Sequence, residues 1–298
     1  MRSVCSIVAL LLVIGCGGPA PEPTGLISGE EVETGYAELG ESRIYYEIKG
    51  EGSPLILIHG GLLDGRMWDG QFDVLAEGYR VIRYDVSGHG RSATPPDAFY
   101  DHEDLHRLMG ALEIDRAVIM GLSLGGRIAI DFALEYPDKV AAMVVVGPGL
   151  GGFRFDSEEV LEGRKELIDS WGKGEWDRVV ELFQRSWTDG PYRSPEEVDP
   201  TVREKVRMMS RQTIENTAEG RTMDPPAVDR LTELKMPMLV VVGELDMPDI
   251  HEIADLLLTA DPNAEKVVIE GAAHMVNMEK PEEFNRVVLE FLEELQPW

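Results

Sequence analysis

The chain has 298 residues, of which 43% are hydrophobic, and its 28 Lys and Arg residues stand against 55 Asp and Glu residues. The formal net charge of −27 repels nucleic acid and anionic lipid headgroups, so we expect no nucleic-acid partner. Beyond a short N-terminal segment, about 270 residues remain, which is enough for one large core that carries an insertion.

The N-terminal segment is typical of an export signal. Met1 and Arg2 provide a positive start, and residues 7–14 form an apolar stretch. This stretch is too short to span a bilayer, for which about 20 residues are needed. At its end, Gly15 and Cys16 follow two aliphatic residues. This pattern resembles the lipobox of bacterial lipoproteins.

The resemblance implies that residues 1–15 are removed as a signal peptide and that Cys16 carries lipid. We then expect residues 16–30 to form a tether, with the exported protein anchored on the periplasmic or outer side of a bacterial membrane. An ordinary export signal with an incidental Cys16 is the alternative. The second cysteine, Cys5, lies in the same segment, so the folded domain has no disulfide and no cysteine-ligated metal.

Apolar runs alternate with helical patterns along most of the remaining chain. Strands are predicted at residues 36–39, 43–49, 54–58, 81–84, 117–120, 140–146, 238–242 and 266–270. Helices are predicted at residues 102–110, at 127–136 and from about 281 onward. Because strands alternate with helices, we predict an α/β fold with a mostly parallel, doubly wound sheet.

Residues 147–227 interrupt this alternation. They contain no convincing buried strand, and helices are predicted at residues 157–170, 175–186 and 200–219. We interpret this segment as an α-helical cap inserted into a core formed by residues 31–146 and 228–298. Trp171, Trp176 and Trp187 all fall within the cap, where they either line a substrate pocket or pack in its interior.

The stretch Gly121-Leu122-Ser123-Leu124-Gly125 fits the pattern G-x-S-x-G between a predicted strand and a predicted helix. A serine in such a turn projects its hydroxyl clear of the sheet, and the two glycines remove side chains that would clash with neighbouring backbone. The N–H of Leu124, at the start of the helix, points toward charge that develops on a substrate oxygen. Ser123 is therefore the candidate nucleophile.

A nucleophilic serine needs a general base and a group that orients the base. Asp246 follows one predicted strand and His274 follows the last, so both are expected at the carboxyl edge of the sheet, beside Ser123. Glu244 and Asp249 are rival acids. The alternation of side chains along a strand and the Gly-Glu-x-Asp pattern favour Asp246.

The mature chain resembles the α/β-hydrolase superfamily along nearly all of its length. The motifs that carry this resemblance appear in the family's order: His59-Gly60-Gly61, Asp85-x-x-Gly88-x-Gly90-x-Ser92, Gly121-x-Ser123-x-Gly125, Gly243-Glu244-x-Asp246 and Gly271-x-x-His274. Within the superfamily, the chain is similar to the branch of capped esterases and enol-lactonases.

The resemblance implies a role for each matching residue. Ser123 is the nucleophile, His274 is the general base, and Asp246 orients His274. The backbone N–H groups of Gly61 and Leu124 form the oxyanion hole. His59 shapes the oxyanion loop, and Asp85 stabilises loop structure.

These residues imply hydrolysis of a small or medium carboxylic ester or lactone through an acyl-enzyme, with a small-molecule substrate. Carbon–carbon bond hydrolysis and cofactor-free perhydrolysis remain open with the same triad, as does a ligand-binding receptor on the same fold. We interpret His102, His106 and His251 as solvated positions, and we expect no catalytic metal and no cofactor. The oligomeric state is left open.

Overall fold

The computed structural model describes residues 31–40, 42–216 and 225–295, which belong to one compact unit. The predicted signal peptide (1–15), Cys16 and the predicted tether (16–30) lie outside the described residues. Within the described part, no helix has the length and apolar character needed to span a membrane.

The described chain forms an eight-stranded sheet in the order β1-β2-β4-β3-β5-β6-β7-β8. β2 is antiparallel to β1 and β4, and the other neighbouring pairs are parallel, so the predicted mostly parallel sheet is confirmed. The strands are β1 (Glu33–Leu39), β2 (Ser42–Lys49), β3 (Pro54–Ile58), β4 (Arg80–Tyr84), β5 (Ala117–Leu122), β6 (Val140–Val146), β7 (Met238–Gly243) and β8 (Glu265–Ile269).

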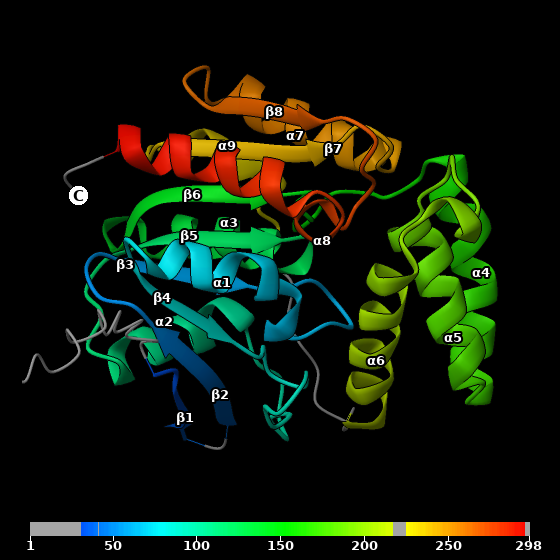
Figure 1. The fold of residues 1–298 in the computed structure, drawn as a ribbon, viewed down its shortest axis with the longest axis horizontal. Helices are drawn as coiled ribbons and strands as arrows, with labels where there is room; N and C mark the ends of the chain where they lie inside the picture. Colours follow the sequence, from blue (N-terminus) through cyan, green and yellow to red (C-terminus); the bar gives the residue numbers. More distant parts are fainter. Residues whose placement is uncertain (1–30, 41, 217–224, 296–298) are drawn as a thin grey trace, which may run out of the picture. The chain divides into compact units, whose positions relative to one another are not determined.

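Helices cover both faces of the sheet (Figure 1). One face packs against α2 (Asp101–Ala111), α3 (Leu124–Glu135) and α7 (Pro248–Ala260), and the other against α1 (Asp69–Ala76) and α9 (Pro281–Glu294).

β3 shows why the central strands are apolar at consecutive positions. Its residues Ile56 and Ile58 belong to the first of these two cores, whereas Leu55 and Leu57 belong to the second. All four side chains are fully buried. A strand that is covered on both faces needs apolar side chains pointing both ways, and this requirement produces the continuous apolar runs that the sequence shows.

The described residues between β6 and β7 are mostly helical, and their helices lie beyond the carboxyl ends of the parallel strands (Figure 1). It contains α4 (Glu158–Lys173), α5 (Trp176–Phe183), the π-helix η3 (Gln184–Asp189) and α6 (Pro200–Asn216). The helix predicted at residues 175–186 thus changes its hydrogen-bond pattern at Phe183. Such π-helical turns are rare and occur frequently at functional sites.

Two helices on the sheet were not predicted, and a third begins earlier than predicted. α1 spans only eight residues, which is too short for a clear helical pattern in the sequence. Its packing on the sheet depends on the burial of Phe72 and Leu75. α7 begins with Pro248 at its first position, which suits a helix start. α3 begins at Leu124, directly after Ser123 rather than at residue 127, so the turn at the serine leads straight into the helix.

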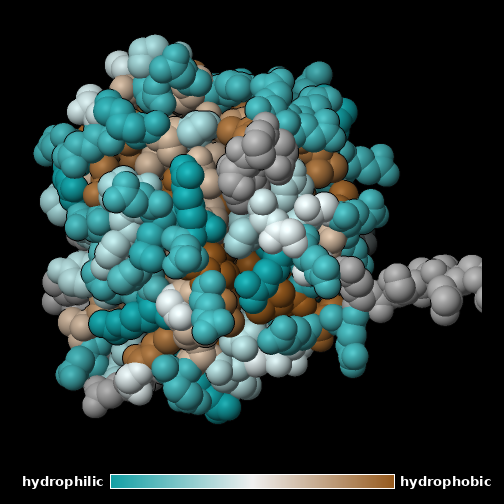
Figure 2. All heavy atoms as spheres, turned by 90° about the vertical axis from the view of Figure 1, so that its left-hand side faces the viewer, coloured by the Kyte–Doolittle hydropathy of each residue, from teal (hydrophilic) through white to brown (hydrophobic). Residues whose placement is uncertain are grey.

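Figure 2 shows the face at the amino ends of the parallel strands, on the side opposite the inserted helices. Hydrophilic side chains cover most of this face, and hydrophobic atoms show between them. The excess of acidic residues in the sequence is consistent with such a surface.

Candidate active site

Ser123 occupies a sharp turn between β5 and α3. Its φ of 56° and ψ of −109° lie in a region that a non-glycine residue adopts only at an energetic cost of about 1–3 kcal/mol. A Cβ on Gly121 would lie 2.1 Å from the carbonyl oxygen of Gly125, and a Cβ on Gly125 would lie 2.2 Å from that of Ile58 in β3. Both glycines are therefore required by the backbone around the serine.

His274 and Asp246 form a buried pair. His274 Nδ1 lies 2.8 Å from Asp246 Oδ2, and the side chains are 2% and 1% exposed. The other carboxylate oxygen of Asp246 accepts a hydrogen bond from the N–H of Met247 at 2.7 Å. Because Nδ1 faces the carboxylate, the carboxylate fixes the ring orientation and leaves Nε2 to exchange a proton with a substrate or a nucleophile.

The end of β6 lies against both Ser123 and this pair. The carbonyl of Val146 accepts a hydrogen bond from the N–H of Ser123 at 2.9 Å. A Cβ on the next residue, Gly147, would lie 3.0 Å from His274 Nδ1 and 3.1 Å from Asp246 Oδ2. Among the described atoms, Nε2 of His274 has no hydrogen-bond partner, so it is not bonded to the Ser123 hydroxyl here. Catalytic hydrogen bonds are often long before substrate binds.

A cavity of about 340 Å³ opens at Ser123. Its apolar walls are Phe155, Val160, Leu167, Trp187, Met247 and Ile250, so the inserted helices supply one side and the start of α7 the other. The Trp187 ring also lies 4.7 Å from the ring of His274.

Of the three tryptophans in the inserted segment, only Trp187 lines this cavity. Trp171 and Trp176 instead pack edge to face, with ring centroids 5.6 Å apart, against a small cluster that includes Val179 and Ile214. They are therefore half-buried and pack within the inserted segment.

The loop after β3 carries the predicted oxyanion donor Gly61. A Cβ on Gly61 would lie 3.9 Å from Cβ of Leu124, so the two predicted donor residues are neighbours. Leu124 is the first residue of α3, and N–H groups in the first turn of a helix have no partner within it.

His59 holds the start of this loop in place. Its Nε2 accepts a hydrogen bond from the N–H of Val86 at 2.8 Å, and its Nδ1 donates to the carbonyl of Gly60 at 2.8 Å. Burial lowers the pKa of His59, which keeps the ring neutral and able to accept at Nε2. His59 thus acts on the loop rather than on substrate.

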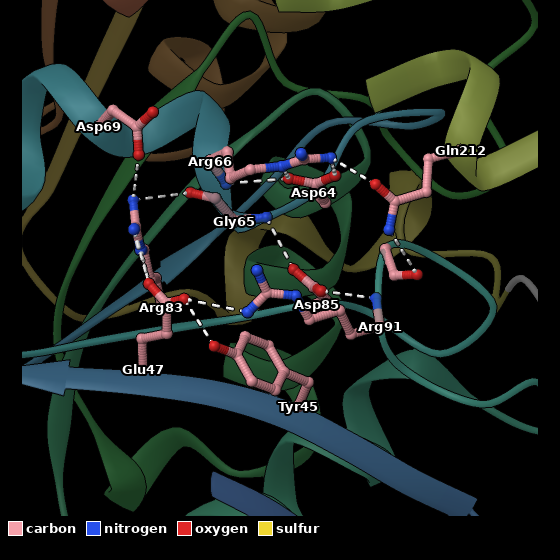
Figure 3. Close-up of polar contacts among 11 residues, drawn as sticks. Tyr45, Glu47, Asp64, Gly65, Arg66, Asp69, Arg83, Asp85, Arg91 and Gln212 are labelled. Carbon is pink, nitrogen blue, oxygen red and sulfur yellow. Dashed lines mark hydrogen bonds and ion pairs between the residues drawn. The ribbon is translucent and has the colours of Figure 1, made fainter. Parts of the chain in front are cut away.

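A network of charged side chains joins this part of the core to the inserted helices (Figure 3). Arg66 Nη2 donates to Asp64 at 2.6 Å and to Gln212 of α6 at 2.8 Å. Gln212 in turn donates to the carbonyl of Gly90 at 3.4 Å. The network therefore ties α6 to two loops of the core.

Asp85 belongs to the same network and accepts hydrogen bonds from both of these core segments. Its two oxygens accept hydrogen bonds from the N–H groups of Gly65 and Arg91, each at 2.8 Å. Burial raises the pKa of Asp85 to about 6, although these two hydrogen bonds act in the opposite direction. These contacts agree with the interpretation of Asp85 as a loop-stabilising residue.

Arg193 connects η3 to the loop that carries His274. Its guanidinium donates to the carbonyl of Asp189 at 2.8 Å and forms an ion pair with Glu279 at 2.7 Å. The other oxygen of Glu279 accepts from the N–H of Ala273 at 3.0 Å, directly before His274. No sequence motif marks these residues, because the contact joins distant segments.

The rival acids have other partners. Glu244 accepts a hydrogen bond from the N–H of Gly271 at 3.0 Å. Asp249 accepts from the N–H groups of Asp156 and Ser157 at 2.8 and 3.3 Å, and so holds the start of α4. Of the three acids considered, Asp246 is the one at His274.

The start of α2 carries a second pattern of potential ligands. Residues 102–106 read His-Glu-Asp-Leu-His, a spacing that places two histidines on one face of a helix. His102 is buried, so its interpretation as solvated is wrong, and the ring of His106 stacks on Tyr136 at 4.0 Å. Glu103 accepts a hydrogen bond from the Tyr136 hydroxyl. In the described part of the chain, no three His, Cys, Asp or Glu side chains are grouped to hold a metal ion.

Known proteins share the sequence pattern and the fold of this chain. Residues 55–287 match the sequence profile of the alpha/beta hydrolase family. A 2-hydroxy-6-oxononadienedioate/2-hydroxy-6-oxononatrienedioate hydrolase of Burkholderia vietnamiensis is 30% identical over 267 residues, which cover 85% of this chain and 91% of that protein. A pimeloyl-(acyl-carrier protein) methyl ester esterase of Aliivibrio fischeri is 29% identical over 259 residues, with 84% and 97% covered. A thermophilic esterase from Thermogutta terrifontis has a similar structure, with a TM-score of 0.74, 29% identity, and 88% of this chain and 99% of that chain covered.

Proposed function

The chain belongs to the alpha/beta hydrolase family, and from this premise we propose that it is a serine hydrolase of small or medium carboxylic esters or lactones, acting through an acyl-enzyme on Ser123. The observation that carries the proposal is the buried His274–Asp246 pair, which packs against the end of β6 beside Ser123 and whose Nε2 has no hydrogen-bond partner among the described atoms. The strained turn at Ser123 supports it further.

In the proposed reaction, His274 accepts the proton of the Ser123 hydroxyl as its oxygen attacks the ester carbonyl carbon. The negative charge that develops on the carbonyl oxygen is stabilised by the N–H groups of Gly61 and Leu124. His274 then protonates the leaving alkoxide, and the acyl group stays on Ser123. Water, deprotonated by His274, releases the acid and restores the serine. Asp246 stabilises the imidazolium form in each half-reaction.

The test combines turnover with chemical labelling. We expect the wild-type protein to hydrolyse 4-nitrophenyl esters or lactones of graded acyl length and to be labelled by a fluorophosphonate probe at Ser123, as located by peptide mass spectrometry. Ser123→Ala and His274→Ala should each lower kcat by about 10⁵-fold or more, and Asp246→Asn by about 10⁴-fold. Combining the substitutions should add little, because the three groups act as a unit.

Ser186→Ala provides a matched control, since Ser186 lines the same cavity. This variant should keep the labelling of Ser123 and should lower kcat far less than Ser123→Ala does. A wild-type protein that takes no probe and hydrolyses no activated ester would favour the ligand-binding receptor instead. Hydrolysis that survives Ser123→Ala would place the reaction elsewhere.

Carbon–carbon bond hydrolysis is the second candidate. The relative from Burkholderia vietnamiensis is named for a 2-hydroxy-6-oxononadienedioate substrate, and its similarity spans 85% of this chain. The same substrate, assayed beside the esters, decides between the two. Turnover of the dienedioate at a higher kcat/KM than any ester would replace the ester proposal.

We also propose that residues 147–227 act as a cap on a core formed by residues 31–146 and 228–298. The position of α4 and η3 on the wall of the cavity supports this division. A cap over the serine excludes water and limits the size of the acyl group.

The N-terminal expectation remains a proposal, because Cys16 lies outside the described residues. We propose that Cys16 becomes the acylated N-terminus and anchors the exported protein to a membrane through its acyl chains. Cell fractionation of the full chain and of Cys16→Ser, with mass spectrometry of the N-terminus, tests it. Equal membrane partitioning of the two proteins, with no lipid found on the wild type, would overturn it.

A further inference from the structure

We propose that Arg164 makes the cavity beside Ser123 selective for esters whose chain ends in a carboxylate. This inference rests on the proposed ester hydrolysis and specifies the class of substrate. It assigns a specificity role to a residue of the inserted helices that no motif singles out.

The cavity is apolar apart from a few groups. Besides Ser123, the polar side chains on its wall are Ser186 and Arg164, and the cavity contains no acidic side chain among the described residues that line it. Apolar walls of this kind suit a hydrocarbon chain, and the few polar groups decide which end of the ligand lies where.

The position of Arg164 on α4 brings it to this wall. Val160, Arg164 and Leu167 are spaced i, i+4 and i+7, so they share one face of the helix, and all three line the cavity. An amphipathic helix would normally place an apolar residue at the middle position. At the preceding residue, Gly163, a Cβ would lie 2.9 Å from Oγ of Ser186, so α4 packs closely against η3 at this point.

The guanidinium of Arg164 is available to a ligand. In the described part of the chain, no carboxylate forms an ion pair with it, and the residue is exposed. Other arginines of the inserted helices are paired, such as Arg178 with Glu166 at 2.6 Å and Arg203 with Glu181 at 3.1 Å. In a chain with 55 acidic and 28 basic residues, an arginine without an acidic partner at the wall of a cavity is a distinct feature.

A substrate carboxylate fits this position. The planar guanidinium offers paired N–H donors that match the two oxygens of a carboxylate. The net charge of −27 repels anions from the rest of the surface, so a local cation is needed to hold one. An ester with its carbonyl at Ser123 and a carboxylate at the far end of an aliphatic chain would contact both polar ends and the apolar walls between them.

The first arm of the test measures hydrolysis by the full chain. The substrates are the mono-4-nitrophenyl esters of adipic and suberic acid, each compared with the neutral ester in which a terminal carboxamide replaces the carboxylate. Arg164→Gln should lower kcat/KM for the carboxylate esters about 10-fold, mainly through KM, and that for the carboxamide esters less than about 2-fold. Arg164→Lys should retain part of the preference, and added salt should weaken it.

Lys165→Gln is the matched control. Lys165 is the next residue on the same helix, and its substitution changes the net charge equally, but it does not line the cavity. We expect the ratio between the paired esters to be unchanged by Lys165→Gln. A ratio that Arg164→Gln leaves unaltered at both chain lengths, or that Lys165→Gln alters equally, would overturn the inference.

The second arm measures binding without turnover. Calorimetry compares monomethyl adipate with dimethyl adipate on Ser123→Ala and on Ser123→Ala with Arg164→Gln. Tighter binding of the monoanion that depends on Arg164 supports the inference even if the wild-type protein hydrolyses no ester, a result that would refute only the proposed function. Hydrolysis of esters together with equal binding of the two adipates would refute the inference alone.

Discussion

Two elements of the inserted helical segment, α4 and η3, differ in how deeply they are buried. In α4, only Ser170 is buried among 16 residues, and Leu161 and Ile168 are 51% and 57% exposed. In η3, Thr188 and Asp189 are fully buried. Both elements line the cavity at Ser123. Asp249 of α7 accepts hydrogen bonds at the start of α4, whereas Arg193 links the end of η3 to Glu279 in the core.

The residue that follows η3 packs against both loops that carry the His–Asp pair. A Cβ on Gly190, at its end, would lie 2.8 Å from the carbonyl oxygen of Leu245 and 2.9 Å from Cβ of Ala273. These residues precede Asp246 and His274 in the chain. Substitutions in η3 should therefore disturb stability and catalysis together, whereas substitutions in α4 should change which substrates are accepted.

The largest effect should come from the buried ion pair of η3. Arg203 of α6 contacts the fully buried carboxylate of Asp189, so Arg203→Met leaves that charge with Arg185 as its remaining ion-pair partner among the described residues. We expect a loss of about 3 kcal/mol in the free energy of unfolding, measured in urea at pH 7. Arg178→Met, at the exposed pair with Glu166 between α4 and α5, should cost less than about 1 kcal/mol. Equal losses would mean that the ion pair at η3 and the pair between α4 and α5 contribute equally to stability.

The free energy of unfolding should depend on pH through Asp85, which holds the core segments that contact α6. Because burial raises its pKa from 3.8 to about 6, the folded protein binds this proton more tightly than the unfolded chain. The resulting stabilisation is complete below about pH 4 and is lost as the pH rises through about 6, with a slope of at most about 1.4 kcal/mol per pH unit. The difference in unfolding free energy between wild type and Asp85→Asn, measured from pH 4 to 7, isolates this contribution.

His89 acts in the opposite direction over the same range. Burial lowers its pKa from 6.5 to about 4, so its contribution is present above pH 6.5 and is lost as the pH falls through about 4. The comparison with Asp85→Asn removes this contribution because both proteins contain His89. A difference that stays constant from pH 4 to 7 would contradict the raised pKa of Asp85.

The tryptophans provide a comparison at the level of catalysis. Trp187→Ala removes the ring beside His274 and one wall of the cavity, and we expect kcat/KM to fall about 10-fold or more, with a changed preference for acyl length. Trp171→Ala should lower the melting temperature and leave the acyl preference as it is, because Trp171 lies in the interior cluster. If Trp171→Ala changed the acyl preference and Trp187→Ala did not, Trp187 would not be the tryptophan that lines the substrate cavity.

The smallest effect is expected on the outer face of α4. Ile168→Ser should change the free energy of unfolding by less than about 0.5 kcal/mol, because the side chain is already 57% exposed. Urea unfolding checks the value, and size-exclusion chromatography of both proteins is the control. A loss above about 2 kcal/mol, or a shift in elution, would show that this face of α4 is covered in solution.

Local sterics made much of the site predictable from the sequence. Gly121 and Gly125 are needed because backbone atoms would lie 2.1–2.2 Å from any Cβ at these positions. The G-x-S-x-G pattern in the sequence therefore predicts the turn directly. The strand β6 (Val140–Val146) was predicted with its observed bounds, because a strand buried on both faces is apolar at every position. The strands in turn place Asp246 and His274 at one edge of the sheet.

The sequence by itself thus determined the sheet, the turn at Ser123 and the edge at which the acid and the histidine lie. Only the tertiary structure decided that Trp187 rather than Trp171 faces the cavity, that Arg164 lies on its wall, and that Arg193 fastens η3. Arg193 and Gly271 contact each other across 78 residues of sequence. Such contacts depend on how whole helices pack against the sheet, whereas a glycine in a tight turn is required by its immediate neighbours.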